Sequence, residues 1–193
     1  MSNVMKVVGS SAHTSEEREE NDFYATDPQA MVDFLEKFHE DGESFAESIW
    51  EPACGEGNLS KELELRGHGV LSTDLINRGY GSQLDFLQVR DTLVFCGDIL
   101  TNPPYKFAEQ FVQMSLRRVQ DGSKVAMLFK LQFVESAKRL ELFQKSPPKF
   151  IYVHSRRIQI WKNNKRSSGN ALCYAWFVWE KGYKGETTLR WIP

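Results

Sequence analysis

The tetrad Asn102-Pro103-Pro104-Tyr105 combines residue types that could hold a planar group bearing an amino nitrogen. The two prolines fix φ and remove two N–H groups, so the loop is rigid and keeps its carbonyls as acceptors. The side-chain oxygen of Asn102 and the carbonyl of Pro103 could accept both hydrogens of an aromatic amine. The ring of Tyr105 could stack on the face of the aromatic ring that carries this amine. This would localise the nitrogen lone pair for attack. The structural alternative is a Pro-Pro turn at a strand end.

A second candidate site is the turn Glu51-Pro52-Ala53-Cys54-Gly55-Glu56-Gly57, which lies between an expected strand and an expected helix. Gly55 and Gly57 lack side chains where backbone would pass close to a ligand, and a helix N-terminus faces the same space. Asp74, at the end of the next expected strand, could accept both ribose hydroxyls of a nucleoside. The full dinucleotide fingerprint is absent, because Ser60 stands at its third glycine position. A tight turn without a ligand is the alternative.

Hydrophobic periodicity and turn residues predict the elements that must position these residues. Helices are expected over 28–39, 58–66, 107–120 and 137–143, and strands over 48–50, 70–73, 92–95, 99–101, 124–129, 150–154 and 171–179. Strands that alternate with helices indicate an α/β fold with a doubly wound, mainly parallel sheet. The last strands lack a helix of ordinary length between them, which predicts an antiparallel hairpin at the sheet edge.

Length and composition limit the kind of protein. The chain has 193 residues, which suits one domain over 22–193 preceded by a flexible polar tail over 1–21. No apolar run approaches the roughly 20 residues needed to span a bilayer, and no secretory signal is evident, so we expect a cytoplasmic protein without a membrane partner. Three scattered cysteines and four scattered histidines show no metal spacing, so we expect no metal.

Charge is distributed unevenly along the chain. Residues 13–47 hold twelve acids against two basic residues, whereas residues 106–193 hold seventeen basic residues against six acids. This asymmetry indicates an anionic partner at the basic end, with ordinary solvated faces as the alternative. Lys130, at the end of an expected strand, suits either substrate contact or surface charge.

Together, these motifs resemble those of the amino-methyltransferase family that acts on DNA bases. Glu51–Gly57 resembles the family's cofactor motif and Asn102–Tyr105 its catalytic motif, in the form typical of adenine N6 enzymes. The segment Asp22–Pro28 resembles the part that folds over the methionine end of the cofactor. The resemblance covers most of the chain, about residues 22 to 179. It implies a seven-stranded, Rossmann-like methyltransferase sheet with S-adenosylmethionine as cofactor and S-adenosylhomocysteine as product.

The resemblance also assigns roles to individual residues. It makes Asn102, Pro103, Pro104 and Tyr105 catalytic. The residues that it implies for cofactor binding are Tyr24, Thr26, Glu51, Pro52, Ala53, Cys54, Gly55, Gly57, Asp74, Asp85 and Phe86. The reaction implied is N6 methylation of a flipped-out or unpaired adenine in DNA.

The chain departs from sequence-reading members of the family because no separate target-recognition domain is evident. The basic stretch after His154 could grip phosphates through Arg156, Arg157, Lys162, Lys165 and Arg166, or it could be a solvated hairpin. We therefore expect low sequence specificity and a monomer or a homodimer. Three alternatives stay open: an RNA adenine N6-methyltransferase, a protein glutamine methyltransferase and a non-catalytic cofactor-binding protein.

Overall fold

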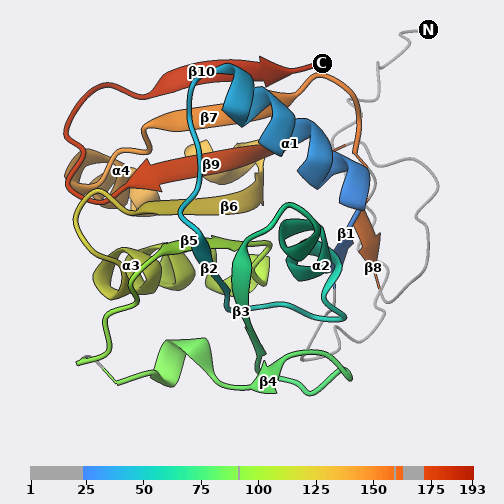
Figure 1. The fold of residues 1–193 in the computed structure, drawn as a ribbon. Helices are drawn as coiled ribbons and strands as arrows, with labels where there is room; N and C mark the ends of the chain where they lie inside the picture. The colour runs from blue at the N-terminus through green and yellow to red at the C-terminus, as the bar shows by residue number, and fades with distance from the viewer. Residues whose placement is uncertain (1–23, 91, 159, 163–171) are drawn as a thin grey trace, which may run out of the picture.

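The computed structural model describes residues 24–90, 92–158, 160–162 and 172–193, and its centre is an eight-stranded sheet. The strands of this sheet are β2 (Ser48–Glu51), β3 (Gly69–Asp74), β4 (Ser82–Gln83), β5 (Asp98–Thr101), β6 (Lys124–Lys130), β7 (Phe150–His154), β9 (Tyr174–Glu180) and β10 (Thr188–Ile192). Their order across the sheet is β10-β7-β9-β6-β5-β2-β3-β4, as Figure 1 shows from top to bottom. β9 is antiparallel to both of its neighbours, and every other pairing is parallel.

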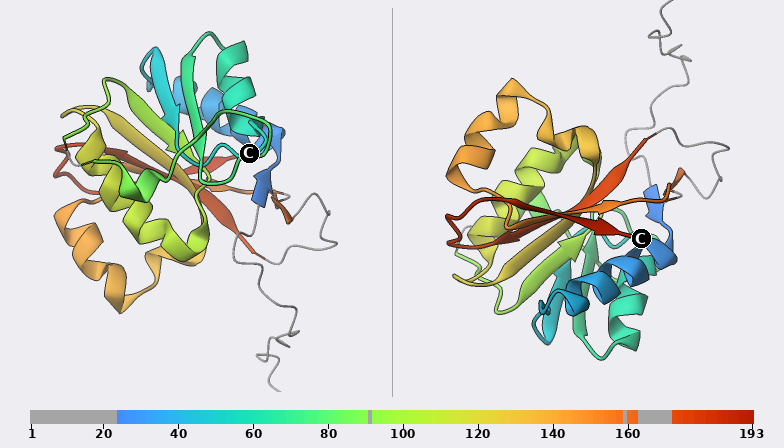
Figure 2. Two further views of the ribbon diagram at one scale, coloured as in Figure 1. Left: turned by 90° about the horizontal axis from the view of Figure 1, so that it is seen from below. Right: turned by 90° about the horizontal axis from the view of Figure 1, so that it is seen from above.

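Helices cover both faces of the sheet, which confirms the doubly wound α/β fold (Figure 2). The helices are α1 (Pro28–Glu40), α2 (Asn58–Leu65), α3 (Ala108–Arg118) and α4 (Leu140–Lys145), and the short 3₁₀ turns are η1 (Phe86–Gln88), η2 (Tyr105–Phe107), η3 (Leu131–Val134) and η4 (Ala137–Arg139). α1 and α2 lie on one face, and α3 and α4 lie on the other. Among the described residues no helix is long and apolar enough to cross a membrane.

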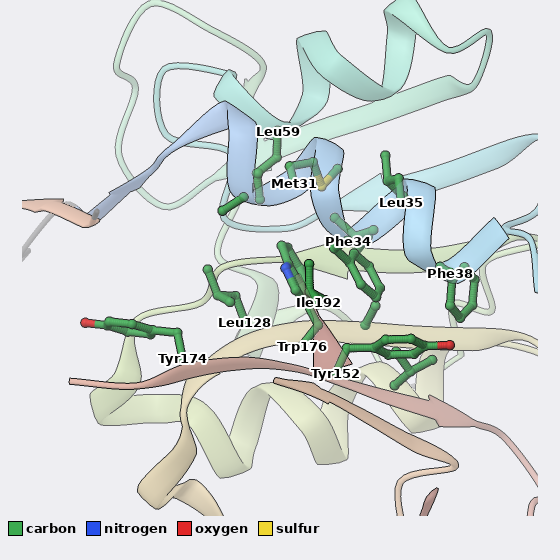
Figure 3. Close-up of a cluster of buried hydrophobic side chains, with 14 of the residues drawn as sticks. Met31, Phe34, Leu35, Phe38, Leu59, Leu128, Tyr152, Tyr174, Trp176 and Ile192 are labelled. Carbon is green, nitrogen blue, oxygen red and sulfur yellow. The ribbon is translucent and has the colours of Figure 1, made fainter. Parts of the chain in front are cut away.

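Each face has its own hydrophobic core. The α1-side cluster joins α1 and α2 to the sheet, and Phe34 stacks on Trp176 at 4.7 Å between ring centroids (Figure 3). The α3-side cluster joins α3 and α4 to the opposite face through residues such as Phe111 and Phe177. α1 begins where the Asp27 side chain accepts the amide of Gln29 at 3.0 Å and Pro28 occupies the first turn, as N-terminal capping requires.

Two features of the sheet differ from the sequence prediction. The predicted hairpin exists as the antiparallel pair β7 and β9, but β10 pairs in parallel with β7 beyond it. β4 was not predicted either, so the sheet has eight strands where the sequence predicts seven, and the hairpin lies one strand in from the edge. The strand expected over 92–95 is wrong: Phe95 forms only an isolated bridge with Val119. β5 already fills the position between β2 and β6, so this segment stays outside the sheet.

Asp98 is the first residue of β5, and the tetrad follows the other end of this strand. Asp98 and the tetrad therefore lie at opposite edges of the sheet. Its side chain is 3% exposed and accepts the amides of Ala46 and Lys124, each at 2.7 Å. Burial raises the pKa of Asp98, although both amide donors favour the charged form. The carboxylate therefore joins the start of β5 to the segment before β2 and to the start of β6, which is a structural role.

We expect Asp98→Ala to lower the free energy of unfolding by about 1–3 kcal/mol, because two part-buried hydrogen bonds to the buried carboxylate are lost. Asp98→Asn keeps one acceptor oxygen and should cost less. Urea unfolding of the purified variants measures both effects. A stability equal to that of the wild-type protein for Asp98→Ala would contradict the structural role.

Candidate active site

The two sequence motifs meet at the carboxyl edge of the sheet, the edge at which its parallel strands end. β2 pairs with β5 through Trp50 and Ile99, and with β3 through Glu51 and Ser72. β3 ends at Asp74 and β5 ends directly before Asn102, so these two residues lie at this edge, on either side of the strand that leads into the glycine turn. Ligands of open α/β sheets bind beyond such strand ends. The fold therefore brings the tetrad, the glycine turn and the acid of β3 into one site.

The carboxylate of Asp74 connects the ends of β2 and β3. One oxygen accepts the amide of Gly55 at 2.9 Å, and the other accepts the amide of Ile76 at 2.9 Å. The turn is fixed further where the amide of Cys54 donates to the carbonyl of Thr73 at 2.9 Å. Asp74 is partly exposed, and a carboxylate oxygen has room for a second hydrogen bond. The side chain is therefore held in place and still able to accept hydroxyl groups.

Glu51 ends β2 as a buried acid, 1% exposed. It accepts a hydrogen bond from the Ser60 hydroxyl, which in turn accepts one from Ser72 at 2.7 Å. Burial raises the pKa of Glu51 to about 8, and the Ser60 hydrogen bond only partly offsets this. Glu51 is therefore mostly protonated at neutral pH, and a cationic group beside it would favour the ionised form.

The glycine turn is tightly packed by protein atoms. Pro52 is buried, Ala53 is partly exposed, and burial raises the pKa of the Cys54 thiol to about 12, so it stays protonated. Gly57 has a left-handed φ of 82°, and a Cβ there would overlap the ring of Tyr80. Glycine is therefore required at position 57 by the turn itself and by the Tyr80 ring, without any ligand close to it.

The tetrad continues β5 and leads into η2. Asn102 is partly buried and Pro103 is buried, while the Pro104 carbonyl accepts the amide of Phe107 at 2.9 Å. The ring of Tyr105 borders both core clusters. Its centroid lies 6.5 Å from that of Phe129 and 6.3 Å from that of Tyr174. Tyr105 is thus held at the edge of the sheet, between the two helical layers.

Asp85 and Phe86 follow β4, and they differ in exposure. Asp85 is exposed and caps η1 by accepting the amide of Leu87 at 3.0 Å. Phe86 is 2% exposed, with its ring centroid 5.1 Å from those of Trp50 and Phe111. Phe86 is therefore mainly a core residue beside β2, and its contact with a cofactor stays a prediction.

The segment before α1 lies beside the basic stretch in a small ribbon. β1 (Tyr24–Thr26) pairs antiparallel with β8 (Ile160–Lys162), so the backbone of Tyr24 is level with that of Lys162. Figure 1 shows this ribbon next to α2, near the carboxyl edge of the sheet. The sequence did not connect these two segments, because their pairing is long-range.

Five residues are predicted to bind phosphates, and one of them, Lys162, ends β8. Arg156 and Arg157 are exposed and follow β7, which also ends at the carboxyl edge. Lys165 and Arg166 lie outside the described residues. Within the described part of the chain, no cluster of three or more His, Cys, Asp or Glu side chains could hold a metal ion.

A groove of about 640 Å³ lies elsewhere, among α3, α4 and the turn after β9. Its lining includes Glu109, Lys145 and Tyr183 and none of the site residues. This groove is at the opposite edge of the sheet, and we assign it no part in the site.

No family model and no curated protein matches the chain. Solved structures match it in fold. A protein of Pyrococcus horikoshii described as an RNA methyltransferase is 13% identical, with a TM-score of 0.58, over 82% of this chain and 86% of that one. The type IIG restriction endonuclease BpuSI is 15% identical, with a TM-score of 0.57, over 87% of this chain and 26% of that one.

A third match is the modification subunit assigned to a type I restriction enzyme of Vibrio vulnificus YJ016, 14% identical with a TM-score of 0.55. It matches 86% of this chain and 45% of the subunit. This chain thus spans less than half the length of the two restriction-enzyme structures. At these identities the likeness establishes the fold: a Rossmann-like α/β sheet shared with methyltransferases.

The raised pKa of Glu51 predicts a pH-dependent stability. The folded protein keeps a proton that the unfolded chain releases above its ordinary pKa of 4.5, so stability is full below 4.5 and falls as pH rises to about 8. Burial also lowers the pKa of His154 to about 4. This residue makes the stability rise with pH, but only below its ordinary pKa of 6.5. Between pH 6.5 and 8 the wild-type protein should lose up to about 1.4 kcal/mol per pH unit.

Glu51→Gln removes this titration and should flatten the curve over the same range. Urea unfolding at intervals from pH 6.5 to 8.5 measures both proteins. Parallel curves for the two would show that Glu51 is ionised in the folded protein, contrary to this account.

Proposed function

We propose that this chain transfers a methyl group from S-adenosylmethionine to an exocyclic amino group of a nucleobase, with N6 of adenine in DNA as the preferred acceptor. The observation that carries the proposal is the position of Asp74 and Asn102 on either side of the glycine turn, at the ends of the strands that flank β2. One half of the site suits a nucleoside cofactor, and the other half suits a planar amine.

The groups at the glycine turn fit this cofactor. Asp74 presents a fixed, partly exposed carboxylate for the two ribose hydroxyls. Glu51, the buried acid at the end of β2, would become ionised beside the cationic amino group of the cofactor. Asp85 and the backbone of β1 are the remaining candidates for contact. When bound, the cofactor supplies an electrophilic methyl carbon on a positively charged sulfur.

The tetrad orients the acceptor and needs no strong base. The Asn102 side-chain oxygen and the Pro103 carbonyl would accept the two amine hydrogens, which localises the lone pair on nitrogen. The nitrogen then attacks the methyl carbon while the carbon–sulfur bond breaks and its electron pair stays on sulfur. The nitrogen, briefly cationic, loses a proton to water. Tyr105, held by Phe129 and Tyr174, would stack on the base.

A nucleic-acid substrate accounts for the basic residues near this edge. Arg156 and Arg157 are exposed there, and two of the solved structures of similar fold come from restriction enzymes. A base inside a duplex is out of reach, so it must be flipped out or unpaired. We expect low sequence specificity, and we expect a monomer or a homodimer.

Three alternatives share the same fold. RNA would use the same adenine chemistry, and one solved structure of similar fold is described as an RNA methyltransferase. A protein glutamine amide is also planar and would fit the tetrad, but it does not account for Arg156 and Arg157. A non-catalytic protein would bind the cofactor and transfer nothing.

The direct test is transfer of a tritiated methyl group to unmethylated DNA, matched RNA and a protein extract. We expect label in N6-methyladenine of DNA. Asn102→Ala should lower the rate on the order of a hundredfold or more, as loss of a preorganised polar group does elsewhere. Its binding of S-adenosylhomocysteine should stay near the wild-type value, which separates chemistry from folding.

Label found only in RNA or in protein would overturn the DNA substrate and leave the methyl-transfer chemistry in place. Cofactor binding with no label in any polymer would favour the non-catalytic alternative.

A further inference from the structure

Two basic segments leave the carboxyl edge of the sheet, one toward each face. After β7, the chain passes Arg156 and Arg157 and anchors Ile158 in the α1-side cluster. β6 ends at Lys130, and the chain that follows anchors Phe133 in the α3-side cluster. Tyr105 packs against both clusters. The ring expected to hold the target base therefore lies between the two segments.

The segment Lys130–Arg139 has a fixed backbone. Phe133 stacks on Phe129 with ring centroids 4.2 Å apart, and the amide of Leu131 donates to the carbonyl of Cys173 at 2.8 Å. The Arg139 guanidinium donates to the carbonyls of Phe133 at 2.8 Å and Glu135 at 2.9 Å, and it lies 4.7 Å from the Phe133 ring. Arg139 therefore stabilises the backbone of this segment, and the side chains that point outward are attached to a rigid backbone.

The outward side chains of this segment suit a polynucleotide. The Lys130 ammonium lies 5.4 Å from the centroid of the Tyr105 ring. Gln132 and Lys138 are exposed, and Val134 is 47% exposed. A lysine contacts phosphates as a point charge, and a glutamine amide pairs with the edge of an adenine. Glu135, the one acid of the segment, is also exposed and would oppose a polyanion.

We propose that Lys130–Arg139 is a second nucleic-acid contact surface, and that the target strand crosses the carboxyl edge from one face of the sheet to the other. Arg156 and Arg157 hold the strand on the α1 side, Tyr105 holds the target base, and Lys130 and Lys138 hold phosphates on the α3 side. Gln132 contacts a base next to the target. This surface rests on the proposed function, because it takes the same substrate.

The test is the salt dependence of binding of a fluorescent single-stranded DNA oligonucleotide with one adenine, in the presence of S-adenosylhomocysteine. The slope of log affinity against log salt reports released counterions, about 0.7 for each phosphate contacted on a single strand. Lys138→Ala should make the slope shallower by about 0.7, and the Lys130→Ala/Lys138→Ala double variant by about 1.4.

Lys184→Ala is the matched control. Lys184 is an exposed lysine at the opposite edge of the sheet, where it donates to the Lys145 carbonyl, and its removal should leave the slope at the wild-type value. Glu135→Gln should bind the oligonucleotide more tightly than the wild-type protein, a gain that misfolding would not produce.

Slopes for the Lys138 and double variants equal to that of the wild-type protein would overturn the surface. If methyl transfer to DNA proceeds in that case, the proposed function stands and only this surface fails. If the slopes fall as expected but no methyl group is transferred, the surface stands and the proposed chemistry fails.

Discussion

The hydrogen bonds that Asp74 accepts from the amides of Gly55 and Ile76 fix the geometry on which the candidate site depends. They join the turn after β2 to the turn after β3, just beyond the last residues through which β2 and β3 pair. The carboxylate is thereby aimed before any ligand arrives, and a preorganised group loses less entropy on binding. Because β5 flanks β2 on the other side, the same arrangement places the tetrad beside the turn.

Burial gives the site its chemical character. Glu51 and Cys54 lie in the turn with raised pKa values, so both are mostly protonated at neutral pH and neither acts as a nucleophile or strong base. This agrees with a transfer in which polar groups orient an amine and the cofactor supplies the reactivity. Tyr105 is fixed where the two hydrophobic cores meet, so its position depends on the packing of both faces.

The sequence predicted the local features well, because they have local causes. The tetrad and the glycine turn were found from prolines, glycines and strand ends, and β7 was predicted with its observed bounds. The features that it missed are long-range. β10 was overlooked because Thr188–Ile192 lies at the far edge, where Leu189 and Trp191 stay 43% and 60% exposed and no apolar run marks a strand. The packing of Tyr80 on Gly57 and the ribbon of β1 with β8 likewise need the folded chain.

Calorimetric titration of the protein with S-adenosylhomocysteine tests the central claim, which is that Asp74 and the glycine turn form a nucleoside site. We predict one-to-one binding that Asn102→Ala leaves nearly unchanged. Asp74→Asn and Asp74→Ala should weaken it about tenfold to a hundredfold, the equivalent of about 1.4–2.8 kcal/mol from lost hydrogen bonds to a charged group. Absence of binding to the wild-type protein, or equal affinity after loss of the Asp74 carboxylate in a folded variant, would contradict the account.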